Sequence, residues 1–463
     1  MPPTGSARAP VSAGTTDELR DLCGDTVACM TRLHRRHGPL VRFPKGGEET
    51  LFAFGPEASE SLLSDPEAFH VHGMPGPRGS SMRRFGLGLF GLNGAPALAQ
   101  RRLLLPPLAR SAVEADEARM LALVERELAA WRTGETIDLA AALRKLALRV
   151  TGRMLFGLED FALADEVAAV FQQWLDEYIR VLFASAFPVE IAPGTYREWL
   201  AAGDRLEERL GALIAQRRAS LRDGDGDLLA ILLRAQQAGG MDDAGLMGAM
   251  HTLFNASYQT TASGLLWTFL MLGQHPDALR DVLRERDGVG LSRPGVPGPT
   301  ERAVREALRL FPPVAFVLRR ATRRASVAGH EVEQGTVVFL GIYATHRDEA
   351  AFPDPLRYDP DRWLAARASP YSYIPFGAGP RMCMGTAFSM RLFGHAAQAA
   401  LSRWRLRIAP EARIDRRTSL TLGTAGPVPA MLLPRDGVRE EEPLSGDIHE
   451  MVRLPQARAR QAA

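Results

Sequence analysis

The chain has 463 residues, of which 46% are hydrophobic and 24% are charged, which excludes a disordered or fibrous protein and supplies a large folded core. Lys and Arg number 56 against 54 Asp and Glu, so the formal net charge of +2 gives no strong field to attract nucleic acid or acidic lipid. Three cysteines are too few for a disulfide scaffold, and no apolar run is long enough to span a membrane. We therefore expect a cytoplasmic protein that binds a small molecule, with no membrane span and no nucleic-acid partner.

The middle of the chain is predicted to be helical. Strand character first occurs at residues 49–54, and from residue 113 to 238 apolar residues recur at three- and four-residue spacing, the period of amphipathic helices. A longer helix should begin at Asp242 or Asp243 and end before Pro276. It is apolar on nearly every face, so it belongs in the core, and its roughly 32 residues would extend about 48 Å. Such a helix can carry a site at mid-length.

Strands return near the end of the chain. Residues 326–332 and 337–343, separated by Glu-Gln-Gly-Thr, are expected to pair as a hairpin, and residues 419–434 as another. Beyond Arg435 the chain is charged and poor in apolar residues, so we expect it not to join the core. We thus predict a mainly α protein with small β-sheets. Its parts are a partly disordered extension (residues 1–32), one large domain (33–435) and a polar tail (436–463).

The most informative motif is a glycine-rich loop that ends in a lone cysteine, PFGAGPRMCMG, followed by a helical pattern. A cysteine at a helix start gains thiolate stability from the helix end, and the glycines let the backbone approach a large flat ligand. These are the needs of an iron–thiolate bond. The loop matches, position for position, the cysteine loop of the cytochrome P450 family. The matching residues are Phe376, Gly377, Gly379, Arg381, Cys383 and Gly385.

The chain therefore resembles that family over residues 33–435, and the resemblance implies a P450 fold with a long central helix over a buried haem. It implies haem b, with its iron held by the Cys383 thiolate and with Phe376, Gly377 and Gly385 against the ring. Arg381 and Arg319 correspond to propionate-binding arginines, with Arg320 replacing Arg319 if the register slips. Arg101 corresponds to a third, although Ala97 stands where the family often has an aromatic ring.

Two further segments resemble family motifs that stabilise the haem side. EALRLFPP is similar to the family's Glu-x-x-Arg helix and PLRYDPDRW to the segment that supplies a third partner. The resemblance implies one buried charge cluster of Glu306, Arg309 and Arg362. Its role would be structural, because a buried charge that loses its partner costs about 3–5 kcal/mol.

The middle of the long helix resembles the family's oxygen-activating stretch, which aligns as Ala256, Ser257, Tyr258, Gln259 and Thr260. Ser257 stands in place of a glycine, and Gln259 stands in place of the carboxylate that relays protons. A glutamine cannot release a proton at neutral pH, so delivery would run through Thr260, Ser257, ordered water or the substrate. Alternatively Gln259 faces roughly 100° away from Thr260 and carries no proton at all.

By analogy with the family, four segments would line the substrate pocket: residues 71–90, 252–256, 314–317 and 422–425. The pocket residues expected from them are Phe85, Val314, Phe316 and Leu422. The segment GLGLFG within the first would be a loop over the haem; with no strand before it, it does not predict a dinucleotide site. This lining favours a lipophilic natural product or fatty-acyl compound.

The resemblance implies a monooxygenase that inserts one oxygen atom from dioxygen. No redox module is evident in the sequence, so electrons should come from NAD(P)H through a separate ferredoxin and ferredoxin reductase, and we expect a monomer. A basic face of Arg101, Arg102, Arg110, Arg381 and Arg391 would receive the acidic ferredoxin. Two alternatives remain: a gas-binding haem protein, and a haem-thiolate enzyme of rearrangement, coupling or peroxide-dependent oxidation, which Gln259 favours.

Overall fold

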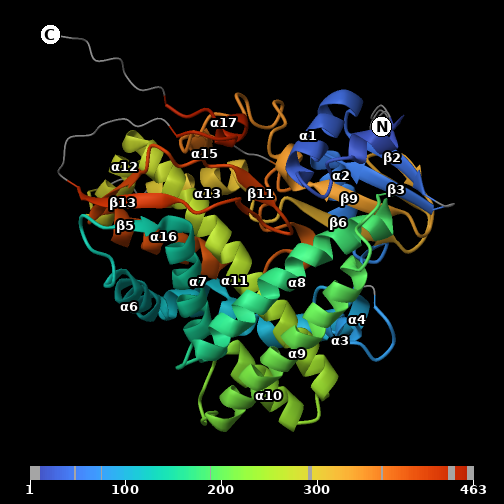
Figure 1. The fold of residues 1–463 in the computed structure, drawn as a ribbon, viewed down its shortest axis with the longest axis horizontal. Helices are drawn as coiled ribbons and strands as arrows, with labels where there is room; N and C mark the ends of the chain where they lie inside the picture. Colours follow the sequence, from blue (N-terminus) through green and yellow to red (C-terminus); the bar gives the residue numbers. More distant parts are fainter. Residues whose placement is uncertain are drawn as a thin grey trace.

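A computed structural model describes residues 11–45, 48–74, 76–187, 189–289, 295–365, 369–435 and 444–455. Helices make up the centre and one end of the molecule, and a sheet with short helices makes up the other end (Figure 1). The helices are α1 (Thr26–His37), α2 (Pro56–Ser64), α3 (Ser81–Phe85), α4 (Gly94–Leu104), α5 (Arg110–Ala115), α6 (Glu117–Leu128), α7 (Leu139–Phe156), α8 (Ala162–Ala186), α9 (Thr195–Ala219), α10 (Leu228–Gln237), α11 (Asp243–Gln274), α12 (Pro276–Arg286), α13 (Pro299–Leu310), α14 (Ile342–Thr345), α15 (Arg362–Ala365), α16 (Thr386–Leu401) and α17 (Ile448–Met451).

The long helix α11 crosses the middle of the molecule, as the sequence predicts (Figure 1). The Asp242 side chain caps it by accepting a hydrogen bond from the Gly245 N–H at 2.8 Å. The helix ends before Pro276, which cannot continue the hydrogen-bond ladder of the preceding turn. Helices α3, α7, α13 and α16 contact it on different sides, which is why it is apolar around its circumference. The fold class predicted from the sequence is confirmed.

Among the described residues, the largest sheet has six strands in the order β1-β2-β3-β9-β6-β4. The other sheets are β10-β13-β5, β11-β12 and β7-β8. The strands are β1 (Val11–Ala13), β2 (Leu40–Lys45), β3 (Glu48–Ala53), β4 (Phe69–Val71), β5 (Thr136–Asp138), β6 (Phe316–Ala321), β7 (Ala325–Val327), β8 (His330–Val332), β9 (Val337–Gly341), β10 (Trp404–Ile408), β11 (Arg416–Thr418), β12 (Leu422–Thr424) and β13 (Pro429–Pro434).

Both predicted hairpins are wrong in their pairing. The segment 326–332 is itself most of a hairpin, β7 with β8, because Ala328 and Gly329 adopt φ of 48° and 78° and make the tight turn that suits a twisted pair. Strand β9 instead joins the large sheet between β3 and β6. At the C-terminal side, β12 pairs with β11, and β13 pairs with β10 and β5.

The described part of the C-terminal tail belongs to the core, so the expectation that it stays outside is wrong. Leu444, Ile448, Met451 and Val452 are buried and pack in the hydrophobic core, although the average composition of the tail is polar. Arg416 holds this segment with an ion pair to Glu450 at 2.9 Å. Residues 436–443 and 456–463 lie outside the described residues.

The expected N-terminal boundary at residue 33 falls inside α1. Leu19 and Leu22 before the helix are buried, as are Cys29 and Met30 within it. Residues 1–10 of the expected extension (residues 1–32) lie outside the described residues. A search of the described helices finds none that is long and apolar enough to cross a bilayer.

Candidate active site

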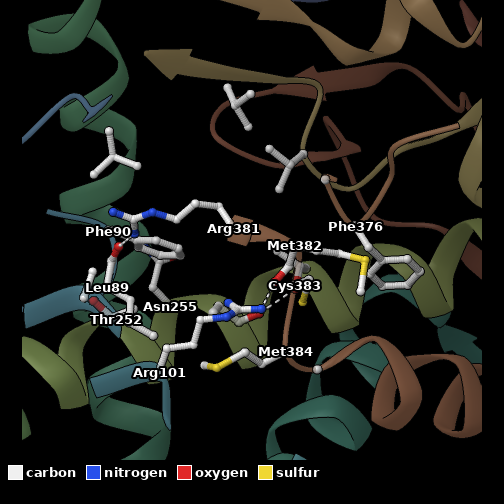
Figure 2. A pocket seen from close by; sticks show the side chains of 18 of the residues that line it. Leu89, Phe90, Arg101, Thr252, Asn255, Phe376, Arg381, Met382, Cys383 and Met384 are labelled. Atoms are coloured by element: carbon white, nitrogen blue, oxygen red, sulfur yellow. Dashed lines mark hydrogen bonds between the residues drawn. The ribbon is translucent and has the colours of Figure 1, made fainter. Parts of the chain in front are cut away.

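A cavity of about 560 Å³ lies between α11, the loop before α16 and strands β4 and β6. Cys383 and Phe376 of the same loop line it (Figure 2), and so do Gly377 and Gly385. The loop is held by a hydrogen bond from the Cys383 N–H to the Phe376 carbonyl at 2.8 Å. At Gly379, with φ of 66°, a Cβ atom would lie 2.1 Å from the Leu63 carbonyl oxygen, so only glycine lets the loop pack here.

The surroundings of Cys383 determine its protonation. Its exposed surface faces the cavity, and burial within the protein raises the pKa of the thiol. The Gly385 N–H, the Arg101 charge and the Thr386 side chain lower the same pKa. Cys23 and Cys29 lie outside the cavity lining, and burial raises the pKa of the Cys29 thiol to about 12. Of the three cysteines, Cys383 is the one that lines the cavity, so it is the one placed to bind an iron there.

Three arginines line the cavity on the side of the cysteine loop: Arg101, Arg319 and Arg381. Arg101 donates to the Met382 carbonyl at 2.5 Å and Arg319 to the Leu318 carbonyl at 2.7 Å. None of the three forms an ion pair with a carboxylate of the described residues. Burial, with a smaller effect of Arg381, lowers the pKa of Arg319 to about 10.

Three cations without anionic partners, around a cavity with a cysteine in its wall, fit a haem with its two propionates. Of the two neighbouring arginines that could correspond to a propionate-binding residue, Arg319 lines the cavity and Arg320 does not. Ala97 lines it at the position where the family often has an aromatic ring. The residues present therefore fit the cofactor that the sequence motifs imply.

Glu306, Arg309 and Arg362 come together beneath the cysteine loop. The Arg309 guanidinium donates twice to the Glu306 carboxylate, at 2.8 and 2.9 Å, and both side chains are fully buried. Arg362 lies 3.4 Å from the same carboxylate, and the Trp363 indole N–H donates to it at 3.1 Å. Arg309 also donates to three backbone carbonyls: those of His346, Pro355 and Arg357. Each buried charge thus has its partners.

His346 links this cluster to the cysteine loop, a role that the sequence analysis missed. Its Nδ1 lies 3.1 Å from the Arg309 carbonyl, and its Nε2 accepts from the Ile374 N–H at 2.9 Å, two residues before Phe376. Burial, followed by the charge of Arg309, lowers the pKa of His346 to about 3, so the ring is neutral. No spacing signal could have found it, because its partners lie 28 and 37 residues away.

The α11 wall places Ala256, Ser257 and Thr260 in the cavity lining, whereas Gln259 is not part of it. The Thr260 hydroxyl donates to the Ala256 carbonyl at 2.6 Å, which leaves its oxygen able to accept a further hydrogen bond. The Gln259 carboxamide instead donates to Gln172 of α8 at 2.9 Å. The structure thus gives the alternative arrangement, in which this side chain turns away from the oxygen site.

Two residues expected in the substrate pocket are not in its lining. Phe85 is fully buried and stacks on the His251 ring, with centroids 4.0 Å apart, behind the α11 wall. Leu422 is also fully buried, and its carbonyl accepts hydrogen bonds from Ser263 and Trp267. Both expectations are wrong, because each side chain faces a helix packing interface rather than the cavity.

Other residues of the expected segments do line the cavity. Val314 and Phe316 line it as predicted, and so do Leu89 and Phe90 of the segment 71–90. The predicted segment 422–425 contributes no residue to the lining, although Leu420, two residues before it, does. The glycine-rich segment reaches α11 at Gly88, where a Cβ atom would lie 2.0 Å from the Gly248 carbonyl oxygen. This close approach brings Leu89 and Phe90 over the cavity.

Comparison with known proteins decides the family. The family model described as cytochrome P450 matches residues 19–433. The chain belongs to the cytochrome P450 family. It is 32% identical over 417 residues to cyclooctatin synthase of Streptomyces melanosporofaciens, covering 86% of this chain and 89% of that one. Pentalenene oxygenase of Streptomyces avermitilis is 28% identical, over 87% and 93% of the two chains.

The fold is likewise that of solved P450 structures. The haem domain of cytochrome P450DA superposes with a TM-score of 0.76 at 24% identity, covering 93% of this chain and 98% of that one. The protein is thus a P450 oxidoreductase of the monooxygenase type, with a haem-thiolate cofactor. When bound, the haem supplies dioxygen activation, which the thiolate promotes by donating electron density. The protein residues position the cofactor, exclude water and deliver protons.

Proposed function

We propose that this P450 inserts one oxygen atom from dioxygen into a neutral, lipophilic, terpenoid-type natural product. The observation that carries the proposal is the division of the cavity lining. The propionates would take up its charged arginines, Arg101, Arg319 and Arg381, while much of the rest of the lining is apolar, including Leu89, Phe90, Leu253 and Phe316. Burial of a hydrocarbon skeleton against these apolar side chains is favourable, and they offer no counter-ion to a charged substrate.

The names of two relatives support this substrate class. One is called cyclooctat-9-en-7-ol 5-monooxygenase, from Streptomyces melanosporofaciens, and is 29% identical over 92% of this chain and 96% of its own; the other is the pentalenene oxygenase described above. The first name denotes oxidation of an alkenol and the second oxidation of an alkene. A carboxylic acid substrate is not favoured, because no lining cation lies on α11.

Electrons would come from NAD(P)H through a separate ferredoxin reductase and ferredoxin. Fewer than the five expected arginines are free to form a basic face. Arg391 is paired with Glu114 and Glu117 at 2.9 Å each, and Arg381 is turned inward to the Leu89 carbonyl at 3.0 Å. Electrostatic steering of an acidic ferredoxin should therefore be modest, with a correspondingly modest loss of reduction rate as salt is added.

The proposal requires that protons reach the oxygen site without a lining carboxylate on α11. Thr260 and ordered water can provide that path, since the threonine oxygen accepts while its hydroxyl is anchored on Ala256. The same observation favours the second candidate, a peroxide-dependent or rearranging haem-thiolate enzyme, which has less need of proton delivery from a donor-driven cycle.

One experiment distinguishes the two functions. The purified holoenzyme is given ferredoxin, reductase, NADPH and oxygen-18 gas, with pentalenene and cyclooctat-9-en-7-ol as probes, and the products are analysed by mass spectrometry. The proposal predicts product that carries oxygen-18 and requires the complete donor chain. Product formed with hydrogen peroxide alone, and none with the donor chain, would instead support the second candidate. No labelled product from either probe or from related terpenes would contradict the proposal.

A further inference from the structure

The distal wall of the cavity contains a polar side chain without a partner. Asn255 lines the cavity from α11 and is only 8% exposed. Its carboxamide has two N–H donors and an acceptor oxygen, and it makes no hydrogen bond to any residue in the described part of the chain. Burial of such a group without partners is unfavourable by an amount that a ligand oxygen could recover.

No neighbouring side chain is hydrogen-bonded to Asn255, and the hydroxyl of Thr252, about one turn earlier on α11, is likewise without a partner among the described residues. Figure 2 shows it on the same side of the view as Leu89 and Phe90, which offer no side-chain hydrogen bond. The polar groups that follow it on α11 are already engaged with other partners. They are Ser257 with the Phe254 carbonyl, Gln259 with Gln172, and Thr260 with the Ala256 carbonyl. Asn255 therefore differs from them in having its hydrogen-bonding capacity directed to the cavity.

A second unpartnered group lies on helix α8, in the same cavity lining. Tyr178 of α8 also lines the cavity, its ring stacks on Trp174 with centroids 5.0 Å apart, and its hydroxyl has no hydrogen-bond partner among the described residues. Burial raises the pKa of Tyr178 to about 12, so the hydroxyl keeps its proton at neutral pH. Helices α8 and α11 thus each present a neutral group that can donate and accept a hydrogen bond.

We propose that Asn255 binds a hydroxyl or carbonyl oxygen of the substrate and thereby selects an already oxygenated, neutral terpene over its hydrocarbon parent. This inference rests on the proposed function and makes its substrate class more specific. A carboxamide suits an uncharged oxygen because it can both donate to it and accept from it, whereas an ionic group would find no counter-charge on this wall. In the free enzyme, solvent that enters the cavity would satisfy these hydrogen bonds, and the substrate oxygen would take its place.

The proposal also places the enzyme in a reaction sequence. Its substrate must come from a step that leaves an oxygen on the ring skeleton, either an earlier oxygenation or a cyclisation that ends by capture of water. The bare hydrocarbon would bind less well, because it would bury the Asn255 carboxamide without replacing its water.

The test is equilibrium binding, measured by the spin-state shift of the oxidised haem band without any electron donor. The probes are matched pairs of a terpene alcohol and its deoxy hydrocarbon, such as cedrol with cedrane and cyclooctat-9-en-7-ol with its deoxy parent. In the wild type at least one alcohol should bind about tenfold more tightly than its hydrocarbon, which is the size expected of one buried polar match. Asn255→Leu should abolish that ratio while hydrocarbon affinity stays the same or improves.

Two further variants exclude a merely structural effect. Leu253→Val changes the neighbouring apolar lining and should weaken both members of a pair equally, and Asn255→Ser should retain part of the preference. Absence of any preference for an alcohol in the wild type, or a preference that survives Asn255→Leu, would overturn the proposal, as would failure of every alcohol to bind. Because no turnover is measured, these outcomes are independent of whether oxygen-18 enters a product.

Discussion

The two walls of the cavity differ in what fixes their residues. On the wall of the cysteine loop, Cys383, Phe376 and Arg319 face the cavity where the sequence motifs placed them. On the α11 side and around it, Gln259 and Phe85 face elsewhere. The first wall must fit one rigid cofactor, which demands a thiolate, close-packed glycines and cations for two propionates. The second wall fits a substrate and a packed helix, and many side-chain arrangements meet those demands.

The polar contacts of the two walls differ in the same way. The Glu306–Arg309 pair on the cysteine side is fully buried, and every charge has several partners. On the α11 side, polar groups are left open, since Asn255 has no described partner and neither ring nitrogen of His251 has one. The satisfied side should tolerate substitution poorly, and the open side should tolerate it well. Substitutions on the two sides can therefore break or sharpen the comparison.

The largest effect is expected for Glu306→Ala, which leaves the Arg309 charge buried without its carboxylate. The loss should be about 3–5 kcal/mol, enough to prevent recovery of folded, haem-loaded protein. The matched control is Glu301→Ala on the same helix, whose pair with Arg305 is about one-third exposed and should contribute less than about 1 kcal/mol. Holoprotein yield and melting temperature measure both. Ordinary yield and stability for Glu306→Ala would show that the cluster is dispensable.

A smaller effect is expected for two buried histidines, His251 on the α11 side and His346 on the side of the cysteine loop. Burial lowers the pKa of His251 to about 3, and His346 reaches a similar value, against 6.5 for an exposed histidine. Between pH 6.5 and pH 3 the unfolded chain binds protons that the folded protein cannot. Each histidine therefore removes about 1.4 kcal/mol of stability per pH unit as the pH falls through this window, and removes none above it.

Substitution should separate the two histidines. His251 makes no hydrogen bond and is surrounded by the uncharged rings of Phe85, Phe171 and Trp174, so His251→Phe should preserve stability at pH 7.5 and reduce the loss at pH 5.5. His346→Phe should destabilise the protein at both pH values, because it leaves the Ile374 N–H and the Arg309 carbonyl unpaired. Melting curves at the two pH values provide the measurement. Equal behaviour of the two variants would contradict the proposed contrast between the walls.

The smallest effect is expected for Gln259→Glu. Because the side chain points to Gln172 and not into the cavity, the new carboxylate should carry no proton to the oxygen site, and the ratio of product formed to NADPH consumed should stay within error of the wild type. Thr260→Ala, which removes the lining hydroxyl, should lower that ratio and raise peroxide formation. A clear rise in coupling for Gln259→Glu would show that this side chain reaches the proton path.

These contrasts also mark what the sequence could predict. Cys383, Glu306 and Arg309 were identifiable because their motifs are local and chemically demanding. Helix α11 was identifiable because its apolar sequence runs without interruption from an N-capping aspartate to the residue before a proline. The pairing of the strands was not predictable in this way. Strand β9 pairs with β3, nearly 300 residues away in the sequence, and with β6, about 20 residues away, and the burial of their faces determines both pairings. The pocket lining was predictable only in part. Within the predicted segment 71–90, Leu89 and Phe90 line the cavity whereas Phe85 does not. The predicted segment 422–425 is not in the lining, although Leu420 just before it is, because tertiary contacts decide between near neighbours.

The central claim is that Cys383 holds the haem iron as a thiolate, and the carbon monoxide complex of the reduced protein tests it most directly. The wild type, Cys23→Ser and Cys29→Ser should all show the strongly red-shifted band of thiolate ligation, because neither of the other cysteines lines the cavity. Cys383→Ala should lose that band, even where haem is retained by its propionate contacts. An unchanged red-shifted band in Cys383→Ala, or its absence from haem-loaded wild type, would contradict the account.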